Sequence, residues 1–248
     1  MAKPQGYVIY KGPSRINGQP IVAIATGFAR PSRNPKTGPM IQTWILRSRV
    51  RPVDAVNRSG DEAICGSCPL RGNRGCYVGV GRAPESVWNT WRNGGYFDAT
   101  SARTSHIVGL MSSHKIRLGS YGDPAAVPMS AWRPWVSGSR MHSGYTHQWR
   151  EVRFAFLKRW VMASVETVAD QEIAIADGWR TFRSTLDDVV LPNEIRCPAS
   201  AEMGFTRDCY SCGACNGNAN GGDRRSIVIK AHGNKAGMSL YAQTIATI

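Results

Sequence analysis

The chain has 248 residues and a hydrophobic content of 42%, so it is long enough to bury a core that folds without crosslinks. No apolar run approaches the ~20 residues that a membrane-spanning helix needs, which speaks against a membrane partner. Residues 1–6 contain no apolar signal segment. We therefore expect a single globular domain in the cytoplasm.

The charge balance is strongly basic. The chain carries 31 Lys and Arg residues against 17 Asp and Glu residues, which gives a net charge of +14. Such a charge favours a polyanionic partner, most simply DNA or RNA. The alternative is that the excess arginine only keeps the protein in solution, because the charge is spread along the chain without a basic tail. The basic loop at residues 31–38 likewise either contacts a phosphate backbone or is simply solvated.

Short apolar runs predict three strands near the N-terminus, at residues 7–10, 21–25 and 41–46. The first helix is predicted to begin near Ala83, because a proline stands in its first turn and apolar residues follow at helical spacing. The stretch between the third strand and this helix holds the first group of cysteines.

Beyond residue 115 the pattern becomes regular, with further strands predicted at 116–120, 144–149, 161–165, 179–183 and 227–229. Helical segments are predicted between them at 128–136, 154–160 and 167–177. We expect Pro134 to bend or shorten the first of these helices, and Gly178 to end the last one. Short strands that alternate with helices indicate βαβ units and a parallel sheet.

Polar residues gather where the predicted strands end, among them Ser120, Asp123, His147, Ser164 and Arg183. In a parallel barrel this is the face that binds ligands. We therefore predict an α/β fold, a full or partial (β/α) barrel, with both cysteine-rich loops at the C-terminal rim of the strands. One barrel-like domain is expected over residues 1–248, with the N-terminal strands and the basic loop in 1–40 and a cysteine-rich insertion at 197–222.

The seven cysteines fall into two groups. An odd number of cysteines in a reducing cytosol favours metal ligation over a disulfide framework. Glycines in both loops allow the tight turns that a metal or iron–sulfur site requires. The predicted metal ligands are Cys65, Cys68 and Cys76 in the first group and Cys197, Cys209, Cys212 and Cys215 in the second.

The second group supplies four thiolates, which is the full ligand set of a 4Fe–4S cluster. The alternative is a tetrahedral zinc ion, which also accepts four thiolates. Zinc sites usually use two separated Cys-x-x-Cys pairs, whereas the sequence from Cys209 to Cys215 is a compact Cys-x-x-Cys-x-x-Cys run. This spacing favours the cluster, although ligand type alone does not decide the metal.

The first group supplies only three thiolates. A cubane held by three thiolates leaves one iron open to a substrate, a cofactor or a fourth side chain. The alternatives are a Cys3His zinc site, a cluster completed by His147 or His232, and a single site shared by both groups, with some cysteines merely buried. Gly79 and Gly81 follow this loop, and their backbone N–H groups are candidates for holding an anionic ligand. With Ser120 they form the predicted cofactor-binding set.

Asp123 and His147 are the candidate catalytic residues. Asp123 precedes a proline, so it is either a turn residue or a group that holds a ribose hydroxyl or an amine at the barrel rim. His147 stands at a predicted strand end and is either a hydrogen-bonded core residue or a functional one. The residue pattern leaves both alternatives open at both positions.

Several linked motifs, between residues 40 and 233, resemble a family of phage-encoded, cysteine-rich proteins known mainly as uncharacterised gene products. The resemblance implies a phage origin, a location in the bacterial host cytoplasm and an iron–sulfur protein, but no defined activity. The motifs are those at 43–46, 120–123, 145–149 and 227–233, together with Cys197-Pro198 and both cysteine runs.

The chain is also distantly similar to radical S-adenosylmethionine enzymes, which place three cysteines after the first strand of a partial barrel. The resemblance implies S-adenosylmethionine as a further cofactor. The spacing Cys65-x2-Cys68-x7-Cys76 departs from the Cys-x3-Cys-x2-Cys of those enzymes and speaks against it. Two functions remain: a redox or radical enzyme acting on a nucleotide or nucleic acid, and a non-catalytic nucleic-acid-binding protein with structural iron–sulfur or zinc sites.

Overall fold

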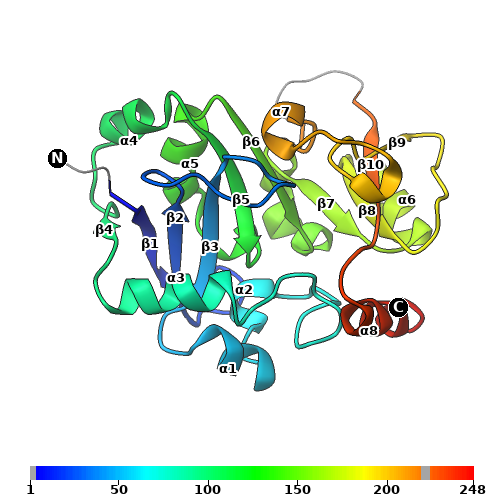
Figure 1. The fold of residues 1–248 in the computed structure, drawn as a ribbon, viewed down its shortest axis with the longest axis horizontal. Helices are drawn as coiled ribbons and strands as arrows, with labels where there is room; N and C mark the ends of the chain where they lie inside the picture. Colours follow the sequence, from blue (N-terminus) through cyan, green and yellow to red (C-terminus); the bar gives the residue numbers. More distant parts are fainter. Residues whose placement is uncertain (1–3, 219–223) are drawn as a thin grey trace.

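The computed structural model describes residues 4–218 and 224–248, so residues 219–222 of the predicted insertion lie outside the described residues. The fold is mixed α/β (Figure 1). Ten strands form one sheet in the order β4-β1-β2-β3-β5-β6-β7-β8-β10-β9. The sheet is not closed in the described part of the chain, since β4 and β9 stand at its two edges.

The first three strands form an antiparallel meander. They are β1 (Gly6–Pro13), β2 (Pro20–Thr26) and β3 (Ile41–Arg47). The turn between β1 and β2 uses Gly18 at a φ of 78°, a conformation that glycine adopts without steric cost. The short strand β4 (Phe97–Asp98) pairs in parallel with β1. The predicted strands are confirmed, and their antiparallel order differs from that of a uniform βαβ barrel.

From β3 onward every strand pair is parallel, as the alternation of strands and helices predicts. Three of the connections carry the predicted helical segments: α5 (Met129–Gly138), the 3₁₀ segment Val152–Arg159 and α6 (Val168–Ala176). The parallel strands are β5 (Lys115–Tyr121), β6 (Met141–Thr146), β7 (Met162–Val165), β8 (Thr181–Thr185), β10 (Ser226–Lys230) and β9 (Glu194–Arg196).

Helix α5 runs through Pro134 to Gly138, so the proline does not shorten it. A proline inside a helix costs about 3 kcal/mol. Trp132 and Trp135 are almost completely buried on the same helix, and the burial of each large side chain contributes an amount of similar size. The packing of these tryptophans therefore explains why the helix continues.

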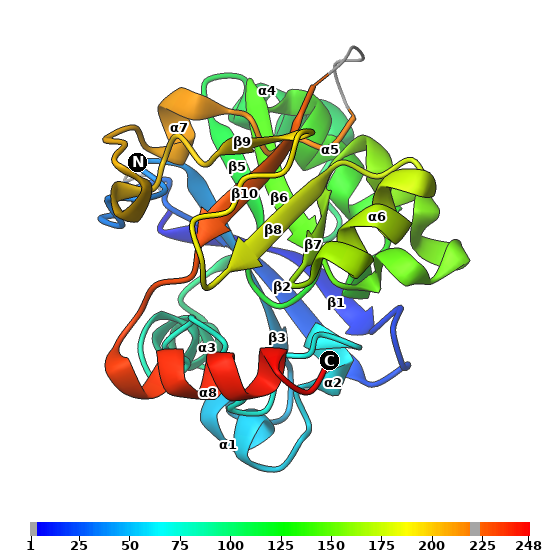
Figure 2. The same cartoon turned by 90° about the vertical axis from the view of Figure 1, so that its right-hand side faces the viewer.

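The helix predicted from Ala83 is confirmed as α3 (Ala83–Arg92). Figure 2 shows the C-terminal helix near α1, α2 and α3 at one end of the sheet. None of the described helices is long and apolar enough to cross a membrane. The helices that the sequence pattern did not predict are α1 (Pro52–Asn57), α2 (Glu62–Cys65), α4 (Thr104–Met111), α7 (Cys209–Cys212) and α8 (Lys235–Ile245).

Two apolar clusters lie against the sheet. The larger one joins β1, β2, β3, β5 and β7 to the helices and contains completely buried side chains such as Ile24, Ile45 and Trp132. The smaller one includes Cys197 and Cys215 together with Met162 on β7. The second cysteine group is therefore part of the apolar packing of this half of the sheet.

The edge strand β9, which leads into Cys197, is held by a buried ion pair. Arg183 on β8 donates to Glu194 through Nε at 2.9 Å and Nη2 at 2.7 Å. The two side chains are only 3% and 0% exposed. Gln171 donates a further hydrogen bond to the same carboxylate. The sequence pattern grouped Arg183 with the polar residues at strand ends. In the structure its side chain instead holds β9 to the sheet through Glu194.

Removing one partner of this pair should destabilise the fold strongly. Arg183→Met leaves the Glu194 charge buried and uncompensated, which costs about 3–5 kcal/mol of unfolding free energy. Urea denaturation measures the loss. The matched control is Asp188→Ala, which breaks the Lys230–Asp188 pair, whose side chains are 36% and 62% exposed; an exposed pair contributes under about 1 kcal/mol. Equal losses in the two variants would contradict a structural role for the buried pair.

Candidate metal centres

The first cysteine loop begins where α2 ends. Cys65 is the last residue of the helix, and Gly66 follows at a φ of 55°. A side chain at Gly66 would meet the amide of Gln148, with its Cβ 2.1 Å from Oε1. Gly66 therefore allows both the left-handed turn and the close approach of Gln148.

The rest of this loop is fixed by Asp61, a buried carboxylate. Asp61 accepts hydrogen bonds from Arg71 Nη1 at 3.0 Å and from the backbone N–H of Gly72 at 2.8 Å. On the other side the loop rests on α8, because a Cβ at Gly75 would lie 2.6 Å from Tyr241 Cα. These contacts fold the segment back on itself, so that Cys76 returns toward Cys65.

The three cysteines of the first group lie close enough for their thiols to influence one another. Burial raises the pKa of the Cys65 thiol, and the neighbouring Cys68 and Cys76 raise it further. Cys65 and Cys76 line a cavity of about 210 Å³, and Tyr121, the last residue of β5, lines it with them. The Tyr121 hydroxyl is buried and has no hydrogen-bond partner among the described residues. A buried donor without a partner is costly, so this hydroxyl fits a bound group that accepts a hydrogen bond.

The ends of β5 and β6 hold the same loop through Asp123 and Gln148. The Asp123 carboxylate accepts hydrogen bonds from Ala125 N, Thr146 Oγ1 and His147 N at 2.8–2.9 Å. The Gln148 amide donates to the carbonyl oxygen of Cys65 at 3.0 Å and accepts from Ser67 N at 3.1 Å. Asp123 thus has the geometry of a turn residue, and burial raises the pKa of its carboxyl against these hydrogen bonds.

His147 is the histidine that the structure places at the first group. Its Nε2 lies 2.9 Å from Glu166 Oε1 and 3.9 Å from Cys68 Sγ. Burial alone would lower the pKa of His147, but Cys68 and Glu166 outweigh it and raise the pKa well above its usual value. The protonated form of His147 is therefore favoured beside Cys68. His232 lies instead beside Lys36 and Glu202, near the second group.

The second group forms around α7. Asp208 caps this helix by accepting from Ser211 N at 2.7 Å, and Gly213 ends it at a φ of 67°. The backbone of Cys209 donates to the carbonyl oxygen of Lys36 at 2.8 Å, and the carbonyl oxygen of Cys215 accepts from Gly144 N at 3.1 Å. The loop is thereby fastened both to the basic loop after β2 and to the middle of β6.

The four thiols of this group also influence one another. Burial raises the pKa of Cys197 to about 11, with Cys209 and Cys212 contributing in the same direction. Burial raises the pKa of Cys215 as well, and the other three cysteines add to the shift. The Lys36 ammonium opposes this at Cys197 and Cys209. The division of the seven cysteines into one site of three ligands and one of four stays a prediction.

The common rim predicted for the two groups is not confirmed. The first lies at the carboxyl ends of β5 and β6, whereas Tyr210 of α7 accepts a hydrogen bond from Lys115, the first residue of β5. Gly213 lies beside Met141, the first residue of β6. Figures 1 and 2 show α2 and α7 at opposite ends of β5. The reason is that the chain after β9 crosses the sheet and is bonded to β6 at Gly144.

Arg117, a buried residue of β5, lies between the groups. Its Nη2 donates to the hydroxyl of Tyr77 at 3.1 Å, and its guanidinium lies 5.2 Å from the ring centre of Tyr145. Burial alone would lower the pKa of Arg117, but Tyr77, Tyr145 and the second-group thiols Cys209 and Cys215 raise it. Sequence reasoning missed this residue, although a charged residue inside an apolar strand is a recognisable signal.

The predicted cofactor-binding residues are not assembled as one set. Ser120 donates to Gln42 Oε1 at 2.6 Å, on the neighbouring strand. Gly79 and Gly81 are exposed in the loop before α3, and neither has a positive φ. A Cβ at Gly81 would meet nothing closer than Val53 at 3.8 Å. The backbone therefore does not require glycine at position 81.

Across residues 4–218 and 224–248, no group of three or more Cys, His, Asp or Glu side chains is arranged to hold a metal ion. Metal uptake at either site therefore requires thiol side chains to turn as well as to lose their protons. No family model, curated protein or solved structure matches the chain. Its function has to be argued from the sites themselves.

The hydrogen bonds between the Gln148 amide and the first cysteine loop, here called the Gln148 clamp, can be tested by mutation. Gly66→Ala should displace the Gln148 amide and lose its hydrogen bonds to Cys65 and Ser67, at a cost of about 1–3 kcal/mol of unfolding free energy. The matched control is Gly72→Ala, which has a similar φ of 63° but no atom within 4 Å of its Cβ. Both positions have a positive φ, and chemical denaturation compares the two losses of stability. Equal destabilisation of the two would contradict it.

The raised thiol pKa values predict how metal affinity depends on pH. Because the pKa of Cys197 is about 11, this thiol is protonated at neutral pH and metal binding must displace its proton. The apparent affinity for Co²⁺ should therefore rise with pH over the range 6–9, roughly tenfold per pH unit for each proton released. Titrations followed by the thiolate-to-cobalt absorption band measure this. A constant affinity over this range would show that the thiols are already ionised.

Proposed function

We propose that this chain is an iron–sulfur protein with two thiolate sites, and that the first site performs redox or radical chemistry on a nucleotide or nucleic acid. The observation that carries the proposal is the proximity of Cys65, Cys68 and Cys76 near the carboxyl ends of the parallel strands. They lie beside the Tyr121 hydroxyl, which has no hydrogen-bond partner among the described residues. In parallel α/β sheets this edge is where ligands bind.

The donor sets at the two sites suit different roles. The second site offers four thiols, three of which belong to or pack against an apolar cluster, and four thiolates would satisfy every iron of a cubane and leave none open. The first offers three thiols, so one iron of a bound cubane would stay open or take a weaker ligand. A bound cluster would supply one-electron transfer at this position. The second cluster would then be structural or an electron relay.

The chain's own residues would serve that chemistry in distinct ways. Glu166 orients the His147 ring through the 2.9 Å contact at Nε2, so that a proton is held at this atom next to Cys68. Asp123 positions the backbone of His147 and the turn that follows β5. His147 is thus the candidate acid, and Asp123 is a positioning residue.

The proposal includes the finer fold and the origin of the protein. Strongly twisted open sheets rarely exceed ~10 strands without curling, which supports a partial (β/α) barrel for the parallel half. The resemblance to phage-encoded cysteine-rich proteins supports a phage origin and the bacterial host cytoplasm as the location. The spacing of Cys65, Cys68 and Cys76 leaves S-adenosylmethionine outside the proposal.

Iron counting on two single variants tests the proposal. Protein prepared without oxygen should contain iron and acid-labile sulfide, and Cys68→Ala and Cys212→Ala should each lose about half of the iron if two 4Fe–4S clusters are present. The half that remains in each variant acts as the internal control. Loss of all iron from either folded variant would mean one shared site, and stoichiometric zinc without iron would contradict the proposal.

The second candidate function is a non-catalytic nucleic-acid-binding protein whose iron–sulfur or zinc sites are structural. The observation in its favour is the net charge of +14, together with exposed arginines that have no ion-pair partner in the described chain, such as Arg33, Arg49 and Arg133. Without a recognised base-reading module, contacts would be mainly to phosphates.

The salt dependence of DNA affinity tests whether this positive charge binds nucleic acid. Affinity for duplex DNA should fall steeply with salt, with a slope of log K against log salt of about −0.9 per phosphate contacted. Fluorescence anisotropy between 50 and 300 mM salt, for two duplexes of unrelated sequence, measures the slope and the sequence preference. Absence of binding at low salt, or binding that salt does not change, would contradict a nucleic-acid partner.

A further inference from the structure

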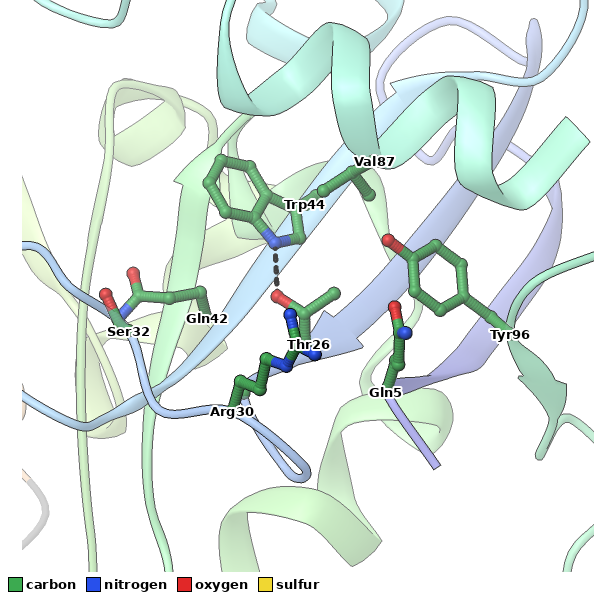
Figure 3. Close-up of a pocket in the computed structure, with 9 residues that line it drawn as sticks. Gln5, Thr26, Arg30, Ser32, Gln42, Trp44, Val87 and Tyr96 are labelled. Atoms are coloured by element: carbon green, nitrogen blue, oxygen red, sulfur yellow. Dashed lines mark hydrogen bonds between the residues drawn. The ribbon is translucent and has the colours of Figure 1, made fainter. Parts of the chain in front are cut away.

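A cavity of about 250 Å³ lies at the N-terminal half of the sheet, away from the cysteines. It is formed by the ends of β2 and β3, by the loop that follows β2, and by Val87 of α3, as Figure 3 shows. Its volume is just below the range of ~300–1,000 Å³ typical of pockets for drug-sized ligands. The cavity therefore suits one small ligand.

Two aromatic rings in this cavity are held in place. The indole Nε1 of Trp44 donates to Thr26 Oγ1 at 2.8 Å, which fixes the orientation of the ring. Tyr96 packs against Gly6, where a Cβ would lie 3.0 Å from the ring. Figure 3 shows both rings bordering the same space. Rings that are already ordered offer stacking area at little entropic cost.

The polar side chains of the cavity have unused hydrogen-bonding capacity. The side chains of Gln5 and Arg30 have no hydrogen bond or ion pair with any part of the chain that the structure describes. Ser32 Oγ accepts from Asn34 N at 3.2 Å, so its hydroxyl proton remains free to donate. Gln42 differs, because its amide is already engaged by Ser120, Thr37 and Met40.

We propose that this cavity binds a nucleobase together with its 5′-phosphate. A base stacks on aromatic side chains such as Trp44 and Tyr96. The amide of Gln5 supplies both a donor and an acceptor, which is the pattern that the edge of a base requires. The guanidinium of Arg30 matches a phosphate with two parallel hydrogen bonds.

None of the seven cysteines lines the cavity, so base binding does not depend on metal at either cysteine site. It extends the proposed function by giving the nucleotide or nucleic acid a defined place to bind. The base can belong to a free nucleotide or to a single strand. The chemistry of recognition is the same in both cases, and the experiment separates them.

The test measures the binding of AMP, adenosine and ribose 5-phosphate to the full-length protein by calorimetry. AMP should bind at least tenfold more tightly than either fragment, because base and phosphate are both recognised. Arg30→Ala should weaken AMP about tenfold and leave adenosine unchanged, and Gln5→Ala should weaken both. The matched control is Arg33→Ala, on the same loop but outside the cavity lining, which should change nothing.

Three outcomes would overturn the proposal. They are the absence of AMP and UMP binding at millimolar concentration, ribose 5-phosphate binding as tightly as AMP, and AMP binding that Arg30→Ala and Gln5→Ala both leave unchanged. Competition of AMP with a short single-stranded oligonucleotide assigns the base to a strand, and lack of competition assigns it to a free nucleotide. Iron content measured on the same samples separates this proposal from the proposed iron–sulfur function. Protein that binds AMP but contains no iron would support nucleotide binding in the cavity and contradict the iron–sulfur clusters.

Discussion

The buried carboxylate of Asp123 holds together the parts of the chain that form the first cysteine site. It lies just after β5, and it fixes the turn there, the end of β6 and the backbone of His147. Gln148, which also contacts Asp123 at 3.3 Å, carries the connection on to Cys65. Because each of these polar groups is buried, losing one partner leaves others unsatisfied. The position of the first thiolates thus depends on this network.

The second cysteine group is fixed by different means. Its loop is packed into an apolar cluster and is bonded to Gly144 of β6 and to the basic loop after β2. Between the two groups lies the guanidinium of Arg117, held by Tyr77, which directly follows Cys76. The Arg117 guanidinium acts against burial at Cys209, where it lowers the pKa of the thiol. The sheet therefore positions two thiol groups of different surroundings at opposite ends of β5.

Much of the fold could be predicted from the sequence. The period of apolar residues located the strands and α3, whereas the division of the cysteines into sites of three and four stays a prediction. The place of His147 after β6, rather than at its end, was not predictable, because the 3₁₀ turn at Gln148–Arg150 depends on tertiary contacts of Gln148 with the cysteine loop. Edge strand β9 is three residues long and depends on the buried Glu194 ion pair. Alternation of strands and helices carried no information on how the loop after β9 crosses the sheet.

The central claim is that the two thiol groups hold separate iron–sulfur clusters. X-ray absorption at the iron and zinc edges, on the wild-type protein prepared without oxygen, tests it most directly. The account predicts iron surrounded by sulfur, with a second shell of iron neighbours, and only traces of zinc. Zinc with four sulfur ligands at about 2.3 Å and no iron would contradict it.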